Sequence, residues 1–85
     1  MTAIRKINRT KNINFLIVSN EHHENLKELP SDKIAEIMTE TVELAKELTR
    51  GVDWSMKMNN GKKSSQTVMH LHAHIYSTVQ DTFGL

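Results

Sequence analysis

Histidines in two short segments are the residues of this sequence best suited to chemistry. His22 and His23 follow one another, and His70, His72 and His74 occupy every second position of a later segment. If that segment is a strand, the three imidazoles share one face of a sheet, because alternate side chains point the same way. The intervening side chains are apolar and face the opposite way: Leu71, Ala73 and Ile75. Three aligned imidazoles opposite an apolar face indicate a functional site.

Such a row suits either a metal site or nucleophilic catalysis. On a straight strand at roughly 3.3 Å per residue, His70 and His74 lie about 13 Å apart, whereas two imidazoles on one zinc ion span only roughly 11 Å. All three therefore cannot bind one zinc, although two of them with His22 or His23 could. In the second chemistry, one neutral imidazole attacks a phosphorus atom while its neighbours donate protons to the phosphate or the leaving group. The alignment favours nucleophilic catalysis and leaves the metal site as an alternative.

A polar segment just before the histidines has the composition of an anion-binding loop. Residues 59–65 read Asn-Asn-Gly-Lys-Lys-Ser-Ser, and Gln66 and Thr67 follow. Turn formers present several backbone N–H groups, and the two lysines and the hydroxyl and amide groups add further donors for an anion. Alone, such a loop is usually a hairpin turn. Beside three aligned histidines, it is predicted to hold a phosphate.

The elements that must position these residues follow from the hydrophobic pattern. The chain has 85 residues and a mass of 9.8 kDa, which is enough for one small domain spanning residues 1–85. We expect strands at residues 13–19, 54–58 and 66–76, the last two forming a hairpin, and a helix at residues 31–50. The order strand, helix, strand, strand predicts an α+β fold, with the helix packed on one face of an antiparallel sheet.

The helix expected at residues 31–50 is amphipathic. Ser31 is placed to cap its first turn, and Gly51 stands where a helix commonly stops. Most acidic residues of the chain lie between Glu21 and Glu47, and those on the helix are expected to form a solvated face. The apolar positions recur at helical spacing and make one stripe: Ile34, Ile37, Met38, Thr41, Val42, Ala45 and Leu48.

Composition and charge exclude several classes of protein. There is no cysteine, so neither disulfides nor a thiolate metal site can support the fold. The formal net charge of +1 gives no sign of a nucleic-acid-binding protein. No apolar run approaches the roughly 18 residues of a membrane span, and residues 15–18 are too short for a secretory signal. We expect a cytoplasmic protein whose acid-free start, residues 1–12, is a surface strand with basic flanks rather than an organellar transit peptide.

Three segments of the sequence resemble the histidine triad (HIT) superfamily. Residues 70–76, His-Leu-His-Ala-His-Ile-Tyr, resemble its signature of three histidines alternating with hydrophobic residues. The Asn-Asn-Gly at residues 59–61 and the Gln-Thr-Val-Met at residues 66–69 have the spacing of the family's Asn-x-Gly and Gln-Ser/Thr-Val segments. Residues 15–22 resemble the strand that leads to a further histidine. The resemblance covers roughly residues 7–80 and is nearest the nucleotide-binding, adenosine phosphoramidase-like branch.

The resemblance implies a hydrolase of purine nucleotides or nucleoside phosphoramidates. Such an enzyme acts at the α-phosphate through a covalent nucleotidyl-histidine intermediate and uses no metal or other cofactor. Carried over by position, His72 would be the nucleophile, and His74 would contact the phosphate and help the leaving group depart. His70 and His22 would orient the neighbouring imidazoles.

The resemblance also assigns residues that bind the substrate. Asn59, Gln66 and Thr67 would hold phosphate oxygens or the leaving group, and the backbone N–H of Ser65 would help them. Phe83 would match an aromatic residue that closes the site in the branch that acts on adenosine phosphoramidates and acyl-adenylates.

The sequence departs from the family pattern in two places. Family members usually have a further N-terminal strand pair and helix, which form the base pocket, and we expect these to be missing from a truncated domain. Lys6 stands where an acidic residue that binds the ribose hydroxyls is expected. Ser64 and Ser65 replace a common pair of glycines, which constrains the loop because glycine reaches φ values that serine resists.

These departures leave several alternatives open. The chain is a fragment of a longer frame, its activity is weak, or a second chain completes the pocket. The alternative to an enzyme is a nucleotide-binding module that keeps the fold without turnover. A small core and unpaired strand edges favour association, and HIT proteins are usually dimers, so we expect a homodimer.

Overall fold

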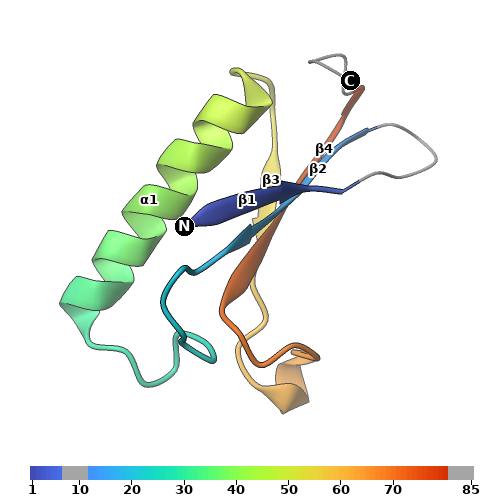
Figure 1. Cartoon of the computed structure of the whole chain (residues 1–85). Helices are drawn as coiled ribbons and strands as arrows, with labels where there is room; N and C mark the ends of the chain where they lie inside the picture. Colours follow the sequence, from blue (N-terminus) through green and yellow to red (C-terminus); the bar gives the residue numbers. More distant parts are fainter. Residues whose placement is uncertain (7–11, 81–85) are drawn as a thin grey trace.

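One antiparallel sheet and one long helix make up the fold (Figure 1). The computed structural model describes residues 1–6 and 12–80. In chain order the elements are β1 (Thr2–Arg5), β2 (Asn12–Val18), α1 (Ser31–Thr49), β3 (Ser55–Lys57), the short 3-10 helix η1 (Lys62–Ser64) and β4 (His72–Gln80). The prediction of an α+β fold with one main helix is confirmed.

The sheet has the strand order β1-β2-β4-β3, and all neighbouring strands are antiparallel. β4 is an inner strand, paired with β2 on one side and with β3 on the other. The predicted pairing of the last two strands is therefore confirmed. The acid-free start contains a surface strand, as expected, because β1 ends at Arg5 and is followed by the exposed Lys6.

The helix α1 follows its predicted bounds closely. The prediction that Ser31 caps it is wrong, because Pro30 is the N-cap residue and Ser31 is already helical. Pro30 has an extended backbone, and its carbonyl accepts the N–H of Ile34 at 3.0 Å, so the first turn closes without a side-chain cap. The other end closes at Arg50, which has a left-handed backbone and is followed by Gly51 with φ of 85°.

The core lies between α1 and one face of the sheet. Ile13, Phe15 and Ile17 of β2 and Ile75 of β4 are buried against Ala45 of the helix. Each fully buried isoleucine contributes about 1.5–3 kcal/mol through the removal of apolar surface from water. These side chains fix which face of each strand points inward and leave the alternate residues on the open face.

Two threonines take part in the inner stripe of α1. Thr41 and Thr49 are fully buried. Their hydroxyls donate to the carbonyls of Ile37 at 2.7 Å and Ala45 at 2.8 Å, one helical turn earlier. Because the hydroxyls are satisfied within the helix, threonine serves in this stripe as an apolar residue does, which confirms the place of Thr41 in the predicted stripe.

The last strand begins later than the sequence pattern predicts. Alternation predicted a strand over residues 66–76, but β4 starts at His72. His72 pairs with Val18, where β2 ends, and β3 reaches only as far as the partner of His74. Residues before 72 therefore have no strand beside them, and alternation of side chains alone does not reveal this.

Backbone hydrogen bonds tie the segment before β4 to the loop that follows β2. The N–H of Leu71 donates to the carbonyl of His23 at 2.6 Å, and the N–H of Ser19 donates to the carbonyl of Leu71 at 3.1 Å. The two connections, residues 19–30 and 58–71, consequently lie together at one end of the sheet (Figure 1). Within the described ranges, the molecule has no helix long and apolar enough to cross a membrane.

Candidate functional site

The open face of the sheet carries the histidines of β4. His72 lies opposite Val18, and His74 lies between Leu16 on β2 and Lys57 on β3. The residues that alternate with these histidines are buried on the helix side: Leu71, Ala73 and Ile75. The predicted division of this segment into an apolar face and a histidine face is therefore confirmed from residue 71 onward.

A cavity of about 370 Å³ joins the three histidines of the row. His70 reaches it from the turn before β4, and His72 and His74 reach it from the strand itself. Its remaining wall is largely apolar and comes from β2 and the turn: Leu16, Val18, Thr67 and Val68. The cavity therefore offers imidazole nitrogens beside an aliphatic surface, a combination that suits a ligand with one polar and one apolar part.

A backbone hydrogen bond fixes the protonation pattern of His72. Its Nδ1 lies 2.7 Å from the carbonyl oxygen of His70. Because a carbonyl only accepts, Nδ1 carries the hydrogen and donates it. In the neutral ring, Nε2 then holds the lone pair. This is the arrangement that a nucleophilic imidazole needs, with one nitrogen held and the other available.

His70 is held in the same manner from the opposite side of the cavity. Its Nε2 donates to the carbonyl of Ser19 at 2.7 Å. Its Nδ1 faces Nδ1 of His22 at 3.4 Å, and the two rings have centroids 5.3 Å apart. The structure thus places His22 beside His70. His70 orients His72 through its main-chain carbonyl. The types of the side chains alone could not have predicted this contact.

His74 differs from the other two because its ring makes no hydrogen bond among the described residues. Its ring lies edge-on to that of His72, with centroids 5.3 Å apart. Burial lowers the pKa of His74 below its ordinary value of 6.5. The charges of Lys6, His72 and Lys57 lower the pKa further. His74 is thus biased toward its neutral form.

The loop before the histidines is organised around the buried side chain of Gln66. Its Oε1 accepts the N–H of Gly61 at 2.7 Å and Nδ2 of Asn25 at 3.0 Å. Its Nε2 donates to the carbonyls of Glu24 at 2.6 Å and Val68 at 2.9 Å. All the usual bonds of this amide are therefore made within the protein, and Gln66 joins the two connections at this end of the sheet.

The other residues assigned to substrate binding surround this loop. Thr67 is exposed and lines the histidine cavity, and Asn59 is half-buried just after β3. The N–H of Ser65 donates to the carbonyl of Lys62 at 3.0 Å, so it is engaged in the turn. Ser65 has φ of 68°, which agrees with the constraint expected where the family commonly has glycine. Phe83 lies outside the described residues.

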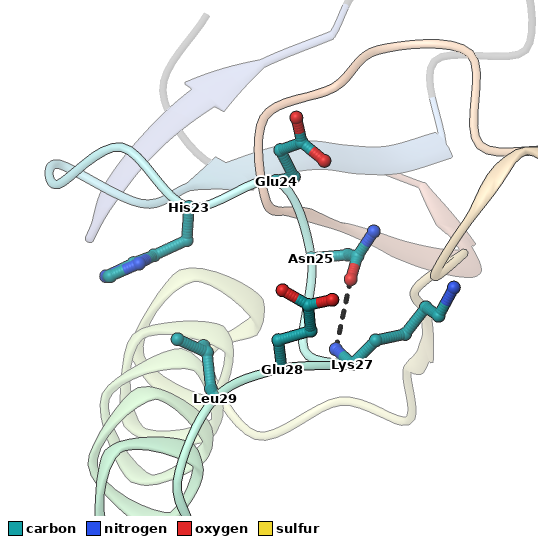
Figure 2. Close-up of a pocket in the computed structure, with 6 residues that line it drawn as sticks. All are labelled: His23, Glu24, Asn25, Lys27, Glu28 and Leu29. Carbon is teal, nitrogen blue, oxygen red and sulfur yellow. Dashed lines mark hydrogen bonds between the residues drawn. The ribbon is translucent and has the colours of Figure 1, made fainter.

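A second cavity of about 370 Å³ lies along residues 23–29 of the connection between β2 and α1 (Figure 2). Figure 2 shows His23 and Leu29 on its helix side and the hydrogen bond from the Lys27 N–H to Asn25 Oδ1. Nε2 of His23 is buried and makes no hydrogen bond among the described residues, although a Glu21 oxygen lies 3.3 Å away. His23 therefore stands apart from the histidine cavity.

The metal alternative lacks a converging set of side chains. Within the described part of the chain, no group of three histidine, aspartate or glutamate side chains is placed to hold one metal ion. His22 approaches His70, and His72 approaches His74, but the two pairs do not converge. The arrangement suits separate contacts to one extended ligand better than ligation of a single ion.

Sequence reasoning missed the main-chain and aliphatic parts of the site. The carbonyl of Ser19 and the amide of Asn25 position the histidines and the loop, and Leu16 and Val18 form the floor of the cavity. The alternation within β2 was the available signal for the floor, since half of an apolar strand must face away from the core. No sequence signal marks the two hydrogen bonds.

An antiparallel sheet with one helix on one face and a histidine-lined cavity on the other is the architecture expected from the histidine triad signature. A family model described as the HIT domain matches residues 1–81, and the chain belongs to this family. An uncharacterised HIT-like protein of Methanocaldococcus jannaschii is 34% identical over 77 residues, which cover 86% of this chain and 58% of that protein. The chain thus spans less than two thirds of the length of this curated relative.

Solved structures agree with the family assignment. A HIT family hydrolase from Clostridium thermocellum is 30% identical and has a TM-score of 0.75, with 98% of this chain and 75% of that chain covered. A HIT family hydrolase from Legionella pneumophila has a TM-score of 0.75 at 22% identity, with 95% and 76% covered. The second similarity supports the fold alone.

Proposed function

We propose that the protein hydrolyses purine nucleoside phosphoramidates or related nucleotidyl compounds at the α-phosphate, with His72 as the nucleophile. The observation that carries this proposal is the hydrogen bond from Nδ1 of His72 to the carbonyl of His70. It leaves the Nε2 lone pair of the neutral ring available in a ring that lines the cavity. The name of the Clostridium thermocellum relative, a HIT family hydrolase, supports the reaction class.

In the proposed first step, Nε2 of His72 bonds to the α-phosphorus while the bond from phosphorus to the leaving nitrogen breaks. The departing amine takes up one proton from the protonated form of His74, which the negative charge of the bound phosphate favours against the lowered pKa of the free protein. In the second step, water adds its hydroxyl to phosphorus, the bond from phosphorus to Nε2 breaks, and the water proton returns to His74. The products are the free amine and a nucleoside 5′-monophosphate.

The remaining histidines have positioning roles in this proposal. His70 orients His72 through its carbonyl, and its own ring is anchored by the carbonyl of Ser19. His22 supports the ring of His70 from the loop after β2. Because main-chain acceptors hold His70 and His72, these two rings need little reorganisation when substrate binds, which favours catalysis.

The loop before the histidines supplies the phosphate contacts in this proposal. Thr67 is the best placed of the assigned residues, because it is exposed and lines the cavity. Asn59 and Ser65 stay predicted contacts, with the Ser65 hydroxyl available while its N–H is engaged. We assign Gln66 a positioning role, since its amide makes four bonds within the protein.

The test is hydrolysis of adenosine 5′-phosphoramidate by the protein and by its His72→Ala variant. We expect release of adenosine monophosphate by the first and a loss of at least about 1,000-fold in the second, because the nucleophile is absent. Mass spectrometry of rapidly quenched protein should find an adenylyl group on His72. His23→Gln is the matched control, since His23 lies outside the histidine cavity. Equal rates for the protein and His72→Ala would remove His72 from the mechanism.

The second candidate is a nucleotide-binding module without turnover. It is favoured by the turn at residues 61–66, where the N–H groups of Ser64, Ser65 and Gln66 all donate to main-chain carbonyls and not toward the cavity. Fewer free donors for the developing charge in the transition state would leave binding without fast chemistry. Titration with adenosine monophosphate separates the candidates: binding with no hydrolysis of the phosphoramidate favours the module.

A homodimer in the cytoplasm stays part of the proposal. Among the described elements, β1 and β3 are the two edges of the sheet and have no further strand beside them. Unpaired edges on a small domain favour association. Sedimentation at several concentrations tests the dimer, and a mass of 9.8 kDa at all of them would contradict it.

A further inference from the structure

The edge strand beside the histidines carries a lysine that the proposed reaction does not use. Lys57 is the last residue of β3 and is paired with His74 on β4, so their backbones lie about 5 Å apart. Paired residues of neighbouring strands point to the same face of a sheet, and Lys57 therefore shares the open face with His74. Because the proposed reaction places His74 at the leaving group, Lys57 adjoins the leaving group as well.

The ammonium of Lys57 is available for a ligand. The residue is exposed, and its side chain makes no hydrogen bond or ion pair with any residue that the structure describes. Its charge reaches His74, because burial first and then the charges of Lys6, His72 and Lys57 lower the pKa of that ring. Of the four strands that the structure describes, none contains aspartate or glutamate. No acidic residue of the sheet therefore competes with a ligand for this cation.

The histidine cavity extends from β4 toward β2 and the turn, and not toward β3. Leu16, Val18 and Val68 form its apolar wall, and none of the described residues that line it belongs to β3. A nucleoside suits this enclosed and largely apolar part of the site, since ligand cavities are lined mainly by apolar side chains. The side of His74 that faces β3 is then left for the leaving group.

The chemistry of the displacement independently directs the leaving group toward Lys57. In phosphoryl transfer the attacking and leaving atoms lie on opposite sides of phosphorus. With Nε2 of His72 as the attacking atom, the leaving nitrogen points along β4 toward His74, which donates the proton. His74 has Leu16 on one side and Lys57 on the other. Because the nucleoside covers Leu16, the substituents of the leaving nitrogen lie beside Lys57.

We propose that Lys57 binds a carboxylate on the leaving amine, so that the preferred substrates are nucleoside phosphoramidates in which an α-amino acid is joined to phosphorus through its amino nitrogen. This inference rests on the proposed function, which places the leaving nitrogen at His74. An α-amino acid carries its carboxylate on the carbon attached to that nitrogen, so the carboxylate faces Lys57 while the nitrogen faces His74. The carboxylate is ionised at neutral pH. A lysine ammonium is a compact charge on a flexible stem, which suits many amino acids rather than one.

Lys6 is the other lysine whose charge acts on His74, and it lies on the opposite side of β4. Its backbone N–H donates to the carbonyl of Asn14 in β2 at 2.8 Å, whereas Lys57 belongs to β3 across the sheet. After burial, the charge of Lys6 lowers the pKa of His74 more than the charge of Lys57 does. The experiment therefore tests both lysines, and the strand direction of the leaving group assigns the carboxylate to Lys57.

The experiment compares two substrates that differ in one charge. Adenosine 5′-phosphoramidates are prepared with glycine and with glycinamide as the leaving amine, and kcat/KM is measured for each at low ionic strength. The readout is the ratio of the two values, glycine over glycinamide, and its change on substitution, because the different basicity of the two amines then cancels. Lys57→Gln should lower this ratio about fivefold, the size expected for one exposed ion pair. Added salt should lower the ratio in the unaltered protein. An unchanged ratio in Lys57→Gln overturns the inference.

Further lysine variants locate the effect. Lys57→Glu should lower the ratio more than Lys57→Gln does, because a carboxylate at this position repels the glycine compound. Lys6→Gln should change the ratio by less than about twofold, and a larger fall there than in Lys57→Gln would place the carboxylate on the β2 side and overturn the assignment. Lys46→Gln removes the same charge from the last turn of α1 and should leave the ratio unchanged. An equal loss for both compounds in Lys57→Gln would place Lys57 on the phosphate and also overturn the assignment.

Binding distinguishes this inference from the proposed reaction. If the protein hydrolyses neither compound, calorimetric titration with both measures the same preference without turnover. Tighter binding of the glycine compound that is lost in Lys57→Gln then supports the inference and contradicts the proposed hydrolase. Hydrolysis through His72 with a ratio that Lys57→Gln does not change overturns only the inference. Neither binding nor hydrolysis of either compound overturns the inference and the proposed function together.

Discussion

The residues in and around the histidine cavity form two groups, a turn wall and a strand wall, that are held by different means. Gln66, Lys57 and Lys6 belong to these groups but do not line the cavity itself. On the turn wall, Gln66 makes four side-chain hydrogen bonds, and His70 is held by the carbonyl of Ser19. On the strand wall, His74, Lys57 and Lys6 have no side-chain hydrogen bonds among the described residues and are placed by strand register alone. One wall is a connected polar network, and the other is a row of independent groups on a stiff sheet.

Because of this difference, a substitution on one wall should change other properties of the site than a substitution on the other wall. In a connected network, loss of one member leaves several part-buried partners unsatisfied, so stability and geometry are lost together. On a sheet face, one charge can be removed without disturbing the pairing of the strands. We therefore expect substitutions on the turn wall to lower stability and activity jointly. Substitutions on the strand wall should change activity, affinity or titration while leaving stability nearly unchanged.

The largest effect is expected for Gln66→Leu, which breaks the turn wall. Leucine has a similar volume, but it leaves the N–H of Gly61 and the carbonyls of Glu24 and Val68 without their partner. These groups are part-buried, so each one left unsatisfied costs about 1 kcal/mol, the low end of the range for buried groups, and we expect the free energy of unfolding to fall by about 3 kcal/mol. Urea denaturation measures it. Thr67→Ala, at the neighbouring exposed position, is the control and should change stability by less than about 0.5 kcal/mol.

A smaller effect on the same wall is expected for His70→Ala. The variant loses the bond from Nε2 to the carbonyl of Ser19 and the contact with His22, so stability should fall by about 1 kcal/mol. The carbonyl of residue 70 is retained, and His72 should keep its hydrogen on Nδ1. Nitrogen chemical shifts of the His72 ring test this directly. A switch of the hydrogen to Nε2 would show that the imidazole of residue 70, and not its carbonyl, sets the state of His72.

On the strand wall, the expected effect is on titration. The pKa of His74 is lowered by burial first and then by the charges of Lys6, His72 and Lys57. The folded protein thus binds fewer protons at this site than the unfolded chain. The free energy of unfolding therefore decreases as the pH falls below about 6.5, where the unfolded chain begins to take up the proton. Lys6→Gln should raise the pKa of His74 while leaving the stability at pH 8 unchanged. Proton NMR titration of the ring measures the shift, and an unaltered titration would place Lys6 too far from His74 to act on it.

Much of the fold and of the strand wall could be predicted from the sequence. The alternation of His72 and His74 with Ala73 and Ile75 sufficed to place the histidines opposite the core, because a strand with one buried face leaves no other choice. Helical spacing likewise placed the stripe of α1, including the buried Thr41. Ser31 shows the limit, because a serine before an apolar run is also an acceptable first helical residue when proline precedes it.

The turn wall could not be predicted in the same way. Its bonds join residues far apart in sequence, such as Gln66 with Glu24 and Leu71 with His23, and nothing in either segment specifies the other. The resemblance to the HIT family selected Gln66 as a substrate contact, whereas the structure shows its amide engaged inside the protein. The alternating pattern before residue 72 is typical of a strand, but it arises here because Val68 and His70 line the cavity from an irregular turn.

The smallest effect is expected for Ser65→Gly in that turn. Ser65 has φ of 68°, a left-handed backbone that costs a non-glycine residue roughly 1–2 kcal/mol. Glycine removes this cost but lowers stability by about 0.5–1 kcal/mol, because it increases the entropy of the unfolded chain. We therefore expect a net gain in stability of about 0.5 kcal/mol, seen as a higher urea midpoint. Ser64→Gly is the matched control, since Ser64 does not have positive φ, and it should lower stability instead. Equal losses for both variants would mean that strain at residue 65 is negligible and that the turn is shaped wholly by Gln66.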